Sequence, residues 1–340
     1  MPPQLQAVAP AAASGWRRPG RAPLASAAAI PSVFKHQLRS PLVSIGIPAY
    51  CRPALLRQTL ASLAAQSGFD DFEVIVCDDL GLPATRREVE ACALPRIQLY
   101  TNARRLGAVA NWNRCLQFAT GRWMMILHED DTLYPWYFST VVHRLRASLS
   151  AIAMKCVSGS TPPALPRPEP DSRLPARRYE PAYFLKGGLS PFPGVLFPRE
   201  LGLRLGGFDE RLGPVADYDF WYRLACAGEA EVLPQTGAFY RVSDDQWTTE
   251  VWPEMLRKMH LLRLRIAREQ FPRHQRFGRW VARFFTHRNA LSYARRFGDG
   301  SEDLKRGLRL RHIPLRRLPS GWVWRALQRA GRRPRASLST

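Results

Sequence analysis

The sequence Met124-Met125-Ile126-Leu127-His128-Glu129-Asp130-Asp131 joins a short apolar run to three consecutive acids. The apolar part is too short for a helix, so it predicts a buried strand that ends directly at the acids. In an open α/β sheet, ligands bind outside the carboxyl ends of the strands, which places these acids at the mouth of a site. Three adjacent carboxylates repel one another unless a cation binds, and oxygen ligands suit Mg²⁺ or Mn²⁺ shared with substrate phosphates. A solvated acidic turn is the alternative for such a motif taken alone.

Two of the strands that precede this segment form a unit with the helix between them. Residues 42–48 form a β-branched run closed by Pro48, and a helix with leucines on one face follows the turn at 49–53. The next strand, 72–77, runs into Asp78 and Asp79. A strand–helix–strand unit implies parallel pairing with a right-handed crossover, so this second acidic pair lies at the same edge as the first.

The alternation of strands and helices continues along the chain and predicts a doubly wound α/β sheet. A strand at 96–100 and a helix at 109–119 flank a basic turn that contains Arg104 and Arg105. Residues 157–193 are dense in Pro, Gly and Ser and are predicted to be a loop or insertion. The remaining predicted elements are helices at 136–149 and 217–224, strands at 194–197, 231–233 and 237–242, and a helical region after Glu254.

Composition restricts the class of protein. The chain has 340 residues and 46% hydrophobic content, enough for one large or two ordinary domains. No apolar run approaches a membrane span and no signal peptide is recognised, so a cytoplasmic location is expected. The six cysteines have neither CxxC nor Cys/His spacing, which argues against a zinc site and a disulfide framework. The net charge is +22, of which residues 255–340 supply +19 from 23 Lys and Arg against 4 Asp and Glu.

Five segments occur in the order and spacing of a known family, over about residues 41–245. They are Ile47-Pro48-Ala49-Tyr50, Asp78-Asp79, Leu106-Gly107-Ala108-Val109-Ala110-Asn111-Trp112-Asn113, Leu127-His128-Glu129-Asp130-Asp131 and Gly206-Gly207-Phe208-Asp209-Glu210. The set resembles the family 2 glycosyltransferases. The resemblance implies a GT-A fold, a Rossmann-like, mostly parallel twisted sheet flanked by helices. It also implies a nucleotide-diphosphate sugar donor, a divalent metal, Mg²⁺ or Mn²⁺, and inversion of the anomeric configuration.

Composition and the resemblance together divide the chain into three parts. Residues 1–40, rich in Ala and Pro, are expected to be a disordered leader. Residues 41–250 would be the catalytic domain, and residues 251–340 a basic, helical extension. The alternation of Arg with Leu, Phe and Trp in that extension suits an amphipathic helix on an anionic membrane. The alternative is that these Arg side chains cover helices that pack on the catalytic domain.

The resemblance also assigns roles to individual residues. Backbone groups of Pro48, Ala49 and Tyr50 would line the nucleotide pocket, with Arg52 close by. Asp79 would contact the base, and Asp130 would lie near the ribose or sugar. Glu129 and Asp131 occupy the place of the family's DxD motif, with Asp131 as the main metal ligand. Asp217 stands where the family has its catalytic base.

Several of these roles have alternatives. Ala216-Asp217 replaces a Glu-Asp pair in the family, so Asp219 remains a second candidate for the base. Asp217 could instead cap the helix that follows it. Asp79 could be a turn residue, and Arg105 either pairs with phosphate or is solvated. Glu129 replaces the first Asp of DxD, and its longer side chain reaches a cation directly or through water.

The chemistry of glycosyl transfer needs two groups. A metal acts as Lewis acid on the diphosphate leaving group, and a carboxylate removes the proton of the acceptor hydroxyl. We therefore expect transfer to a saccharide or lipid-linked acceptor in surface polysaccharide or glycolipid biosynthesis, with peripheral membrane contact through the basic extension. A catalytically silent nucleotide-sugar-binding relative is the alternative. A nucleic-acid-binding protein is disfavoured, because the basic excess lacks a nucleic-acid motif and lies away from the acids.

Overall fold

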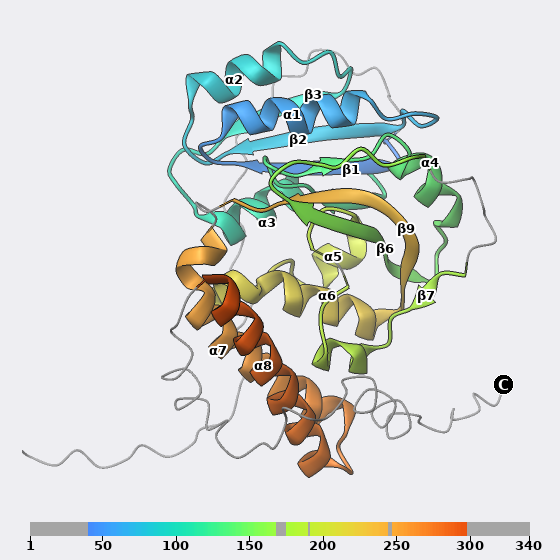
Figure 1. Ribbon diagram of the computed structural model, residues 1–340. Helices are drawn as coiled ribbons and strands as arrows, with labels where there is room; N and C mark the ends of the chain where they lie inside the picture. Colours follow the sequence, from blue (N-terminus) through green and yellow to red (C-terminus); the bar gives the residue numbers. More distant parts are fainter. Residues whose placement is uncertain (1–39, 168–174, 190, 244–246, 298–340) are drawn as a thin grey trace, which may run out of the picture. The chain divides into compact units, whose positions relative to one another are not determined.

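The computed structural model describes residues 40–167, 175–189, 191–243 and 247–297 (Figure 1). These ranges include most of the predicted catalytic domain, residues 41–250, and the first part of the basic extension. The leader predicted at residues 1–40 lies outside the described residues except for Ser40, and so does the part of the basic extension beyond Phe297.

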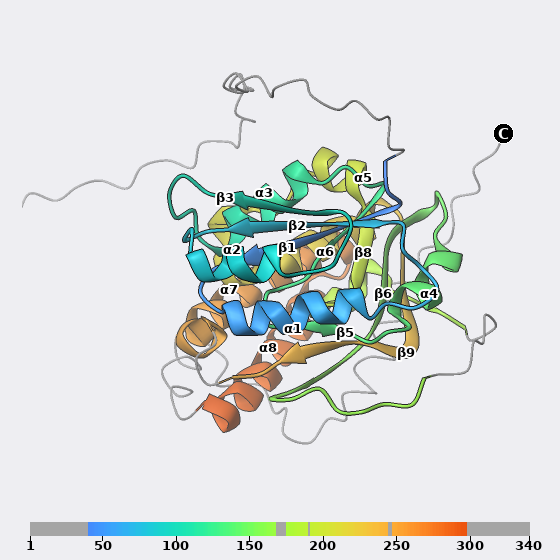
Figure 2. The same cartoon turned by 90° about the horizontal axis from the view of Figure 1, so that it is seen from above.

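Four parallel strands form the first half of the sheet. They are β1 (Val43–Ala49), β2 (Phe72–Asp78), β3 (Ile97–Thr101) and β4 (Trp123–Ile126), in the spatial order β3-β2-β1-β4 (Figure 2). The β-branched and apolar runs of β1, β2 and β4 are buried on both faces, as expected of parallel strands, whereas β3 lies at the edge and is partly exposed. All four carboxyl ends meet at one edge of the sheet, which confirms the predicted doubly wound α/β architecture.

Helices cover both faces of these strands. The helices α1 (Pro53–Ala64) and α2 (Pro83–Glu90) lie on one face, where Leu56, Leu60 and Val89 join its apolar core. The helix α3 (Ala108–Phe118) lies on the other face, and Trp112, Cys115 and Leu116 belong to the second core. Figure 1 shows α1 and α2 on one side of β1 and β2 and α3 on the other.

The second half of the sheet is mixed. The strand β8 (Val195–Pro198) pairs antiparallel with β4 and with β6 (Leu149–Gly159), and β6 pairs parallel with β9 (Glu229–Arg241). The short strands β5 (Thr132–Leu133) and β7 (Arg177–Arg178) pair antiparallel with β9. Two late strands predicted at 231–233 and 237–242 are therefore one strand, whose ladder with β6 shifts register near Met154 and Lys155.

The predicted helix at 136–149 is wrong in its second half. The helix α4 (Tyr137–Val141) continues only into a 3₁₀ turn, η1 (Val142–Arg144), and β6 begins at Leu149. The loop predicted from residue 157 begins inside β6. Ser150, Ala151 and Ala153 have little intrinsic strand preference, so it is pairing with β8 and β9 that makes this segment a strand.

The last elements form a helical layer under the mixed strands. They are η2 (Pro181–Leu185), α5 (Arg199–Arg204), η3 (Glu210–Val215), α6 (Ala216–Ala227), α7 (Trp247–Gln270) and α8 (Gln275–Phe297). The helix α7 packs against η2, η3 and α8, and both long helices bury side chains in the same core as α3 and α6. In the described part of the chain, every helix is too short or too polar to cross a membrane.

Candidate active site

The acids after β4 are tied to the turn after β1. The carboxylate of Glu129 accepts hydrogen bonds from the backbone N–H groups of Cys51, at 3.2 Å, and Arg52, at 3.3 Å. The guanidinium of Arg52 in turn donates to Oδ2 of Asp130, at 2.5 Å. The two segments that the sequence placed at one edge of the sheet are thus in direct contact.

Asp131 is fully buried and only half satisfied. Its Oδ1 accepts a hydrogen bond from the backbone N–H of Arg241, at 2.9 Å, whereas Oδ2 has no hydrogen-bond partner among the described residues. Nδ1 of His128 lies 3.7 Å from this Oδ2. Burial, together with the charge of Asp130, raises the pKa of Asp131 well above its ordinary value. A buried carboxylate in this state requires a proton or a cation.

Three side chains at this turn fit a divalent cation. One ligand atom each from His128, Asp130 and Asp131 lies within 4.8 Å of the other two. Burial lowers the pKa of His128, which keeps its imidazole neutral and able to donate an electron pair. The unpartnered Oδ2 of Asp131 supplies the hard oxygen that Mg²⁺ and Mn²⁺ prefer. The donor set therefore fits the metal that the sequence predicted.

The structure groups these residues differently from the sequence analysis. Glu129, predicted as a metal ligand, directs both carboxylate oxygens at the backbone of residues 51 and 52, and is not in the three-residue group. His128, which was not among the predicted site residues, is in it. The only sequence signal for His128 was its place directly before the acids. Ligation by Glu129 remains a prediction.

Arg241, at the end of β9, binds the turn of residues 128–131, which we call the acid turn. Besides its backbone bond to Asp131, its guanidinium donates to the carbonyl of Asp130, at 3.0 Å. It also donates to the carbonyl of Ser160 and the side chain of Gln58. One arginine therefore holds β9, α1 and the acid turn together.

The predicted nucleotide-binding residues lie at the same edge of the sheet. The guanidinium of Arg105 lies over the ring of Tyr50, 4.7 Å from its centroid. Pro48 and Ala49 end β1, and the carbonyl of Ala49 accepts a hydrogen bond from the N–H of Asp79, at 3.0 Å. The stacked pair thus brings a residue of the first turn next to a residue of the loop before α3.

Asp79 supports that loop. Its carboxylate accepts hydrogen bonds from the N–H groups of Leu106, at 2.7 Å, and Gly107, at 2.9 Å, and from the amide of Asn102, at 2.9 Å. These donors hold the turn that carries Arg105 at the start of α3. Both oxygens are engaged, so this side chain has a structural task whether or not it also contacts a base, which stays a prediction.

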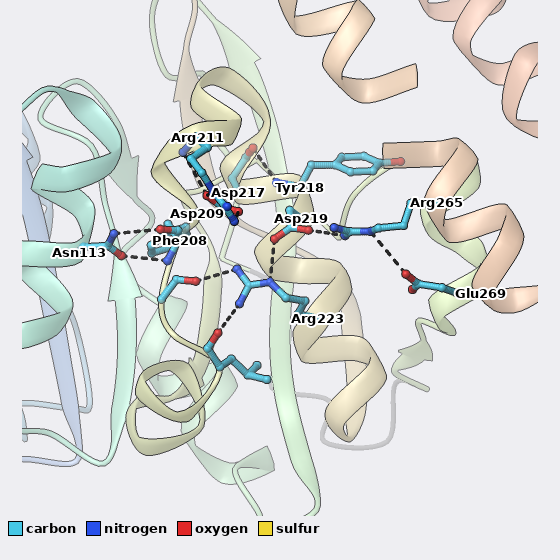
Figure 3. A network of polar contacts seen from close by, with 12 residues as sticks. Asn113, Phe208, Asp209, Arg211, Asp217, Tyr218, Asp219, Arg223, Arg265 and Glu269 are labelled. Atoms are coloured by element: carbon cyan, nitrogen blue, oxygen red, sulfur yellow. Dashed lines mark hydrogen bonds and ion pairs between the residues drawn. The ribbon is translucent and has the colours of Figure 1, made fainter. Parts of the chain in front are cut away.

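Asp217 and Asp219 differ sharply in their surroundings (Figure 3). Asp219 is 3% exposed and forms ion pairs with Arg223, at 2.7 Å, and with Arg265 of α7. Asp217 is half-buried, and its Oδ1 accepts a hydrogen bond from the N–H of Tyr218, at 2.7 Å. No described cation pairs with Asp217, and burial raises its pKa to about 6. Of the two candidates for the base, Asp217 is therefore the one without an arginine partner among the described residues.

The network around Asp219 also fixes the turn of residues 205–209. Arg223 donates to the carbonyls of Leu205 and Gly207, each at 2.7 Å. From the opposite side, Asn113 of α3 accepts from the N–H of Phe208 and donates to its carbonyl, both at 2.9 Å (Figure 3). The turn and the first turn of α6 are thus held between α3 and α7.

Aromatic rings connect the acid turn to α6. The His128 ring lies 4.6 Å from that of Phe192 and 5.7 Å from that of Trp112. Phe192 in turn contacts Phe208 and Trp221, at 5.7 and 5.6 Å between ring centroids. Trp221 is 1% exposed and is therefore a core residue. Phe192 lies in the predicted loop, where nothing in the sequence marked it.

These features define a GT-A-type α/β protein with an acidic cluster where the parallel strands end. Residues 44–198 match the sequence profile described as Glycosyl transferase family 2, so this segment, a little under half of the chain, is of that family. The solved structure of the mannosyltransferase PcManGT from Pyrobaculum calidifontis, in complex with GDP-Man and Mn²⁺, is similar in fold. Its TM-score is 0.52 at 20% identity, over 86% of this chain and 85% of that one.

Two relatives are similar in sequence. Over 218 residues the chain is 28% identical to the succinoglycan biosynthesis protein ExoO of Rhizobium meliloti, a match covering 60% of this chain and 62% of ExoO. Over 90 residues it is 34% identical to WfgD of Escherichia coli, covering 26% of this chain and 35% of WfgD. WfgD is described as a UDP-Glc:alpha-D-GlcNAc-diphosphoundecaprenol beta-1,3-glucosyltransferase. The chain thus spans less than two thirds of either relative.

Proposed function

We propose that this protein transfers a sugar, with inversion, from a nucleotide-diphosphate donor to a saccharide or lipid-linked acceptor in surface polysaccharide or glycolipid biosynthesis. The observation that carries the proposal is the fully buried Asp131, whose Oδ2 lacks a hydrogen-bond partner in the described structure beside His128 and Asp130. The family match supports the reaction class, and the descriptions of ExoO and WfgD support the acceptor class.

The donor would bind along the carboxyl edge of the parallel strands. His128, Asp130 and Asp131 would hold Mg²⁺ or Mn²⁺, with Glu129 as the further predicted ligand. When bound, the metal would neutralise negative charge on the leaving diphosphate as a Lewis acid. Arg105 stacks on Tyr50 and presents a cation at the same edge, where it would pair with donor phosphate.

Asp217 would act as the general base. With a pKa near 6, its carboxylate is mostly ionised at neutral pH yet basic enough to accept the proton of an acceptor hydroxyl. Direct inversion requires that this base and the leaving group lie on opposite faces of the transferred sugar. Asp219 is neutralised by two arginines and would serve to fix α6.

A lipid-linked acceptor would be met at the inner face of the membrane. The basic extension after residue 250 is the proposed point of peripheral contact there, because anionic lipids attract clustered Lys and Arg.

Calorimetric titration of the purified protein with UDP, GDP and dTDP, with and without Mn²⁺, tests the donor site. We expect metal-dependent binding of one nucleotide, lost in Asp131→Asn and retained in Asp71→Asn, which removes an exposed carboxylate that pairs with Arg96 at the surface. Absence of binding to all three nucleotides would reject the proposal. Binding without sugar transfer or donor hydrolysis would instead identify the silent relative.

A further inference from the structure

The helix α8 exposes a row of arginines on one face. Arg276, Arg279 and Arg283 are exposed, and the half-buried Trp280 lies among them. Their spacing of three and four residues places all four side chains along one side of a helix. We call these four residues the α8 stripe.

The three arginines of the α8 stripe are exposed, although α8 packs on α7. The contacts to α7 include Gly278, which lies against Ala267, and Thr286, whose hydroxyl lies 3.1 Å from Nδ1 of His260. At about 100° per residue, the three arginines are turned by about 100° or more from Gly278, whereas Arg279 and Arg283 lie closer to the direction of Thr286. Burial lowers the pKa of the His260 imidazole, and the charge of Arg283 reaches it and contributes to this lowering. The arginines therefore border the helix pair on its solvent-exposed side.

The charge of this face is not compensated. The α8 sequence, residues 275–297, contains no Asp or Glu. None of the three stripe arginines forms an ion pair with a carboxylate of the described residues. The chain continues into residues 298–340, which add 11 Lys and Arg against 3 Asp and Glu. An extended surface of one sign attracts a partner of the opposite sign.

Aromatic rings lie along the same helix. Trp280 stacks on Phe277, at 6.2 Å between centroids, and on Phe284, at 5.7 Å. An amphipathic Trp ring beside Arg side chains suits the boundary between lipid headgroups and acyl chains, and guanidinium groups bind phosphate bidentately. Nucleic acid offers phosphate as well, but the described part of this helix pair lacks a recognisable nucleic-acid-binding motif.

We propose that the α8 stripe docks the protein on an anionic lipid bilayer. The bilayer's phosphates would pair with Arg276, Arg279 and Arg283, and the part of Trp280 that is not packed against the core would face the headgroups. The inference rests on the membrane contact proposed above and assigns it to particular residues of α8. Binding needs neither donor nor metal, so its failure is separate from a failure of the donor site.

The test uses the full chain and vesicles, without nucleotide or metal. Vesicles of phosphatidylcholine alone are compared with an equal mixture of phosphatidylcholine and phosphatidylglycerol. A Lys or Arg near an anionic surface contributes about fivefold to binding, so Arg276→Gln, Arg279→Gln and Arg283→Gln together should weaken binding on the order of 100-fold. Since the attraction is between exposed charges, binding should fall as salt is added.

A control variant with the same loss of net charge shows whether the position of the arginines on α8 matters. Arg86→Gln, Arg87→Gln and Arg204→Gln together remove three exposed arginines of α2 and α5, and this variant should bind like the wild type. Equal losses in both triple variants, or no preference of the wild type for anionic vesicles, would overturn the proposal. Tighter binding to duplex DNA than to the anionic vesicles, weakened by the same stripe variant, would overturn it in favour of a nucleic-acid surface. If the stripe triple variant fails to fold by circular dichroism, the three single variants carry the test, with about fivefold expected for each.

Discussion

Replacement of Asp217 by Asn should stabilise the protein at neutral pH while it removes the proposed base. Burial raises the pKa of Asp217 from its ordinary 3.8 to about 6, so the fold disfavours the ionised carboxylate. Each tenfold change in an acid constant corresponds to about 1.4 kcal/mol, which gives a cost of about 3 kcal/mol at pH 7. Because Asp217 is half-buried, solvent screening reduces this to about 1–2 kcal/mol.

The sign of the pH dependence is set by linkage. A group whose pKa is raised in the folded state stabilises the fold fully below the unfolded value of 3.8 and loses this contribution as pH rises through about 6. The amide of Asn has no such titration and keeps an oxygen that accepts the N–H of Tyr218. The stability gain of Asp217→Asn should therefore be largest above pH 7 and shrink as pH falls toward 4.

Thermal unfolding at several pH values measures this difference. At pH 7.5 the melting temperature of Asp217→Asn should rise by about 2–8 °C, since 1 kcal/mol corresponds to about 2–4 °C in a domain of this size. Asp70→Asn removes an exposed carboxylate and should change stability by less than about 0.5 kcal/mol. Sugar transfer by Asp217→Asn should fall about 10²- to 10⁴-fold. A melting temperature lower than that of the wild type at pH 7.5, or a difference that does not vary with pH, would refute the reasoning.

Two further changes probe the scaffold. Asp219→Asn leaves Arg223 and Arg265 without a carboxylate partner and should lower the free energy of unfolding in urea by about 3 kcal/mol. As a control, Asp209→Asn breaks the more exposed ion pair with Arg211 and should lower it by about 1 kcal/mol or less. Gly207→Ala should destabilise by about 2–3 kcal/mol, because φ is +66° and the new Cβ would lie 2.5 Å from Oδ1 of Asn113. Gly206→Ala, at φ +82° with open space around the Cβ, should cost only about 1 kcal/mol, and similar losses at both glycines would contradict the packing argument.

The parallel half of the sheet could be predicted from the sequence because each of its strands is marked by its own residues. The segments that became β1, β2 and β4 are buried on both faces and appear as unbroken apolar runs that end at Pro or acids. The strand β6 carried no such signal, since Ala, Ser and Met fit a helix equally well. Its conformation depends on β8 and β9, which lie about 40 and 80 residues further along the chain.

The site was predictable as a location but not as a set of side-chain directions. Strand order alone brings the acids after β4 to the turn after β1. Residues 128–131 lie in a turn, where side chains follow no regular period. Their spacing therefore could not show that the Glu129 carboxylate points to the backbone of residues 51 and 52, or that the His128 ring lies beside Asp131. Likewise, the choice between Asp217 and Asp219 depends on Arg265, which lies 46 residues beyond Asp219.

The surroundings of the acids separate structural from reactive carboxylates. Asp79 receives three N–H donors and Asp219 receives two guanidinium groups, so each is satisfied by the protein alone. Asp131 is fully buried and Asp217 is half-buried, and the pKa of each is raised because burial outweighs the charges and N–H donors that the described protein supplies. A fold retains such a cost where an external group completes the site, which under the proposed function would be a cation at Asp131 and a hydroxyl proton at Asp217. These two acids with raised pKa therefore mark the proposed chemistry more sharply than the acidic motif does.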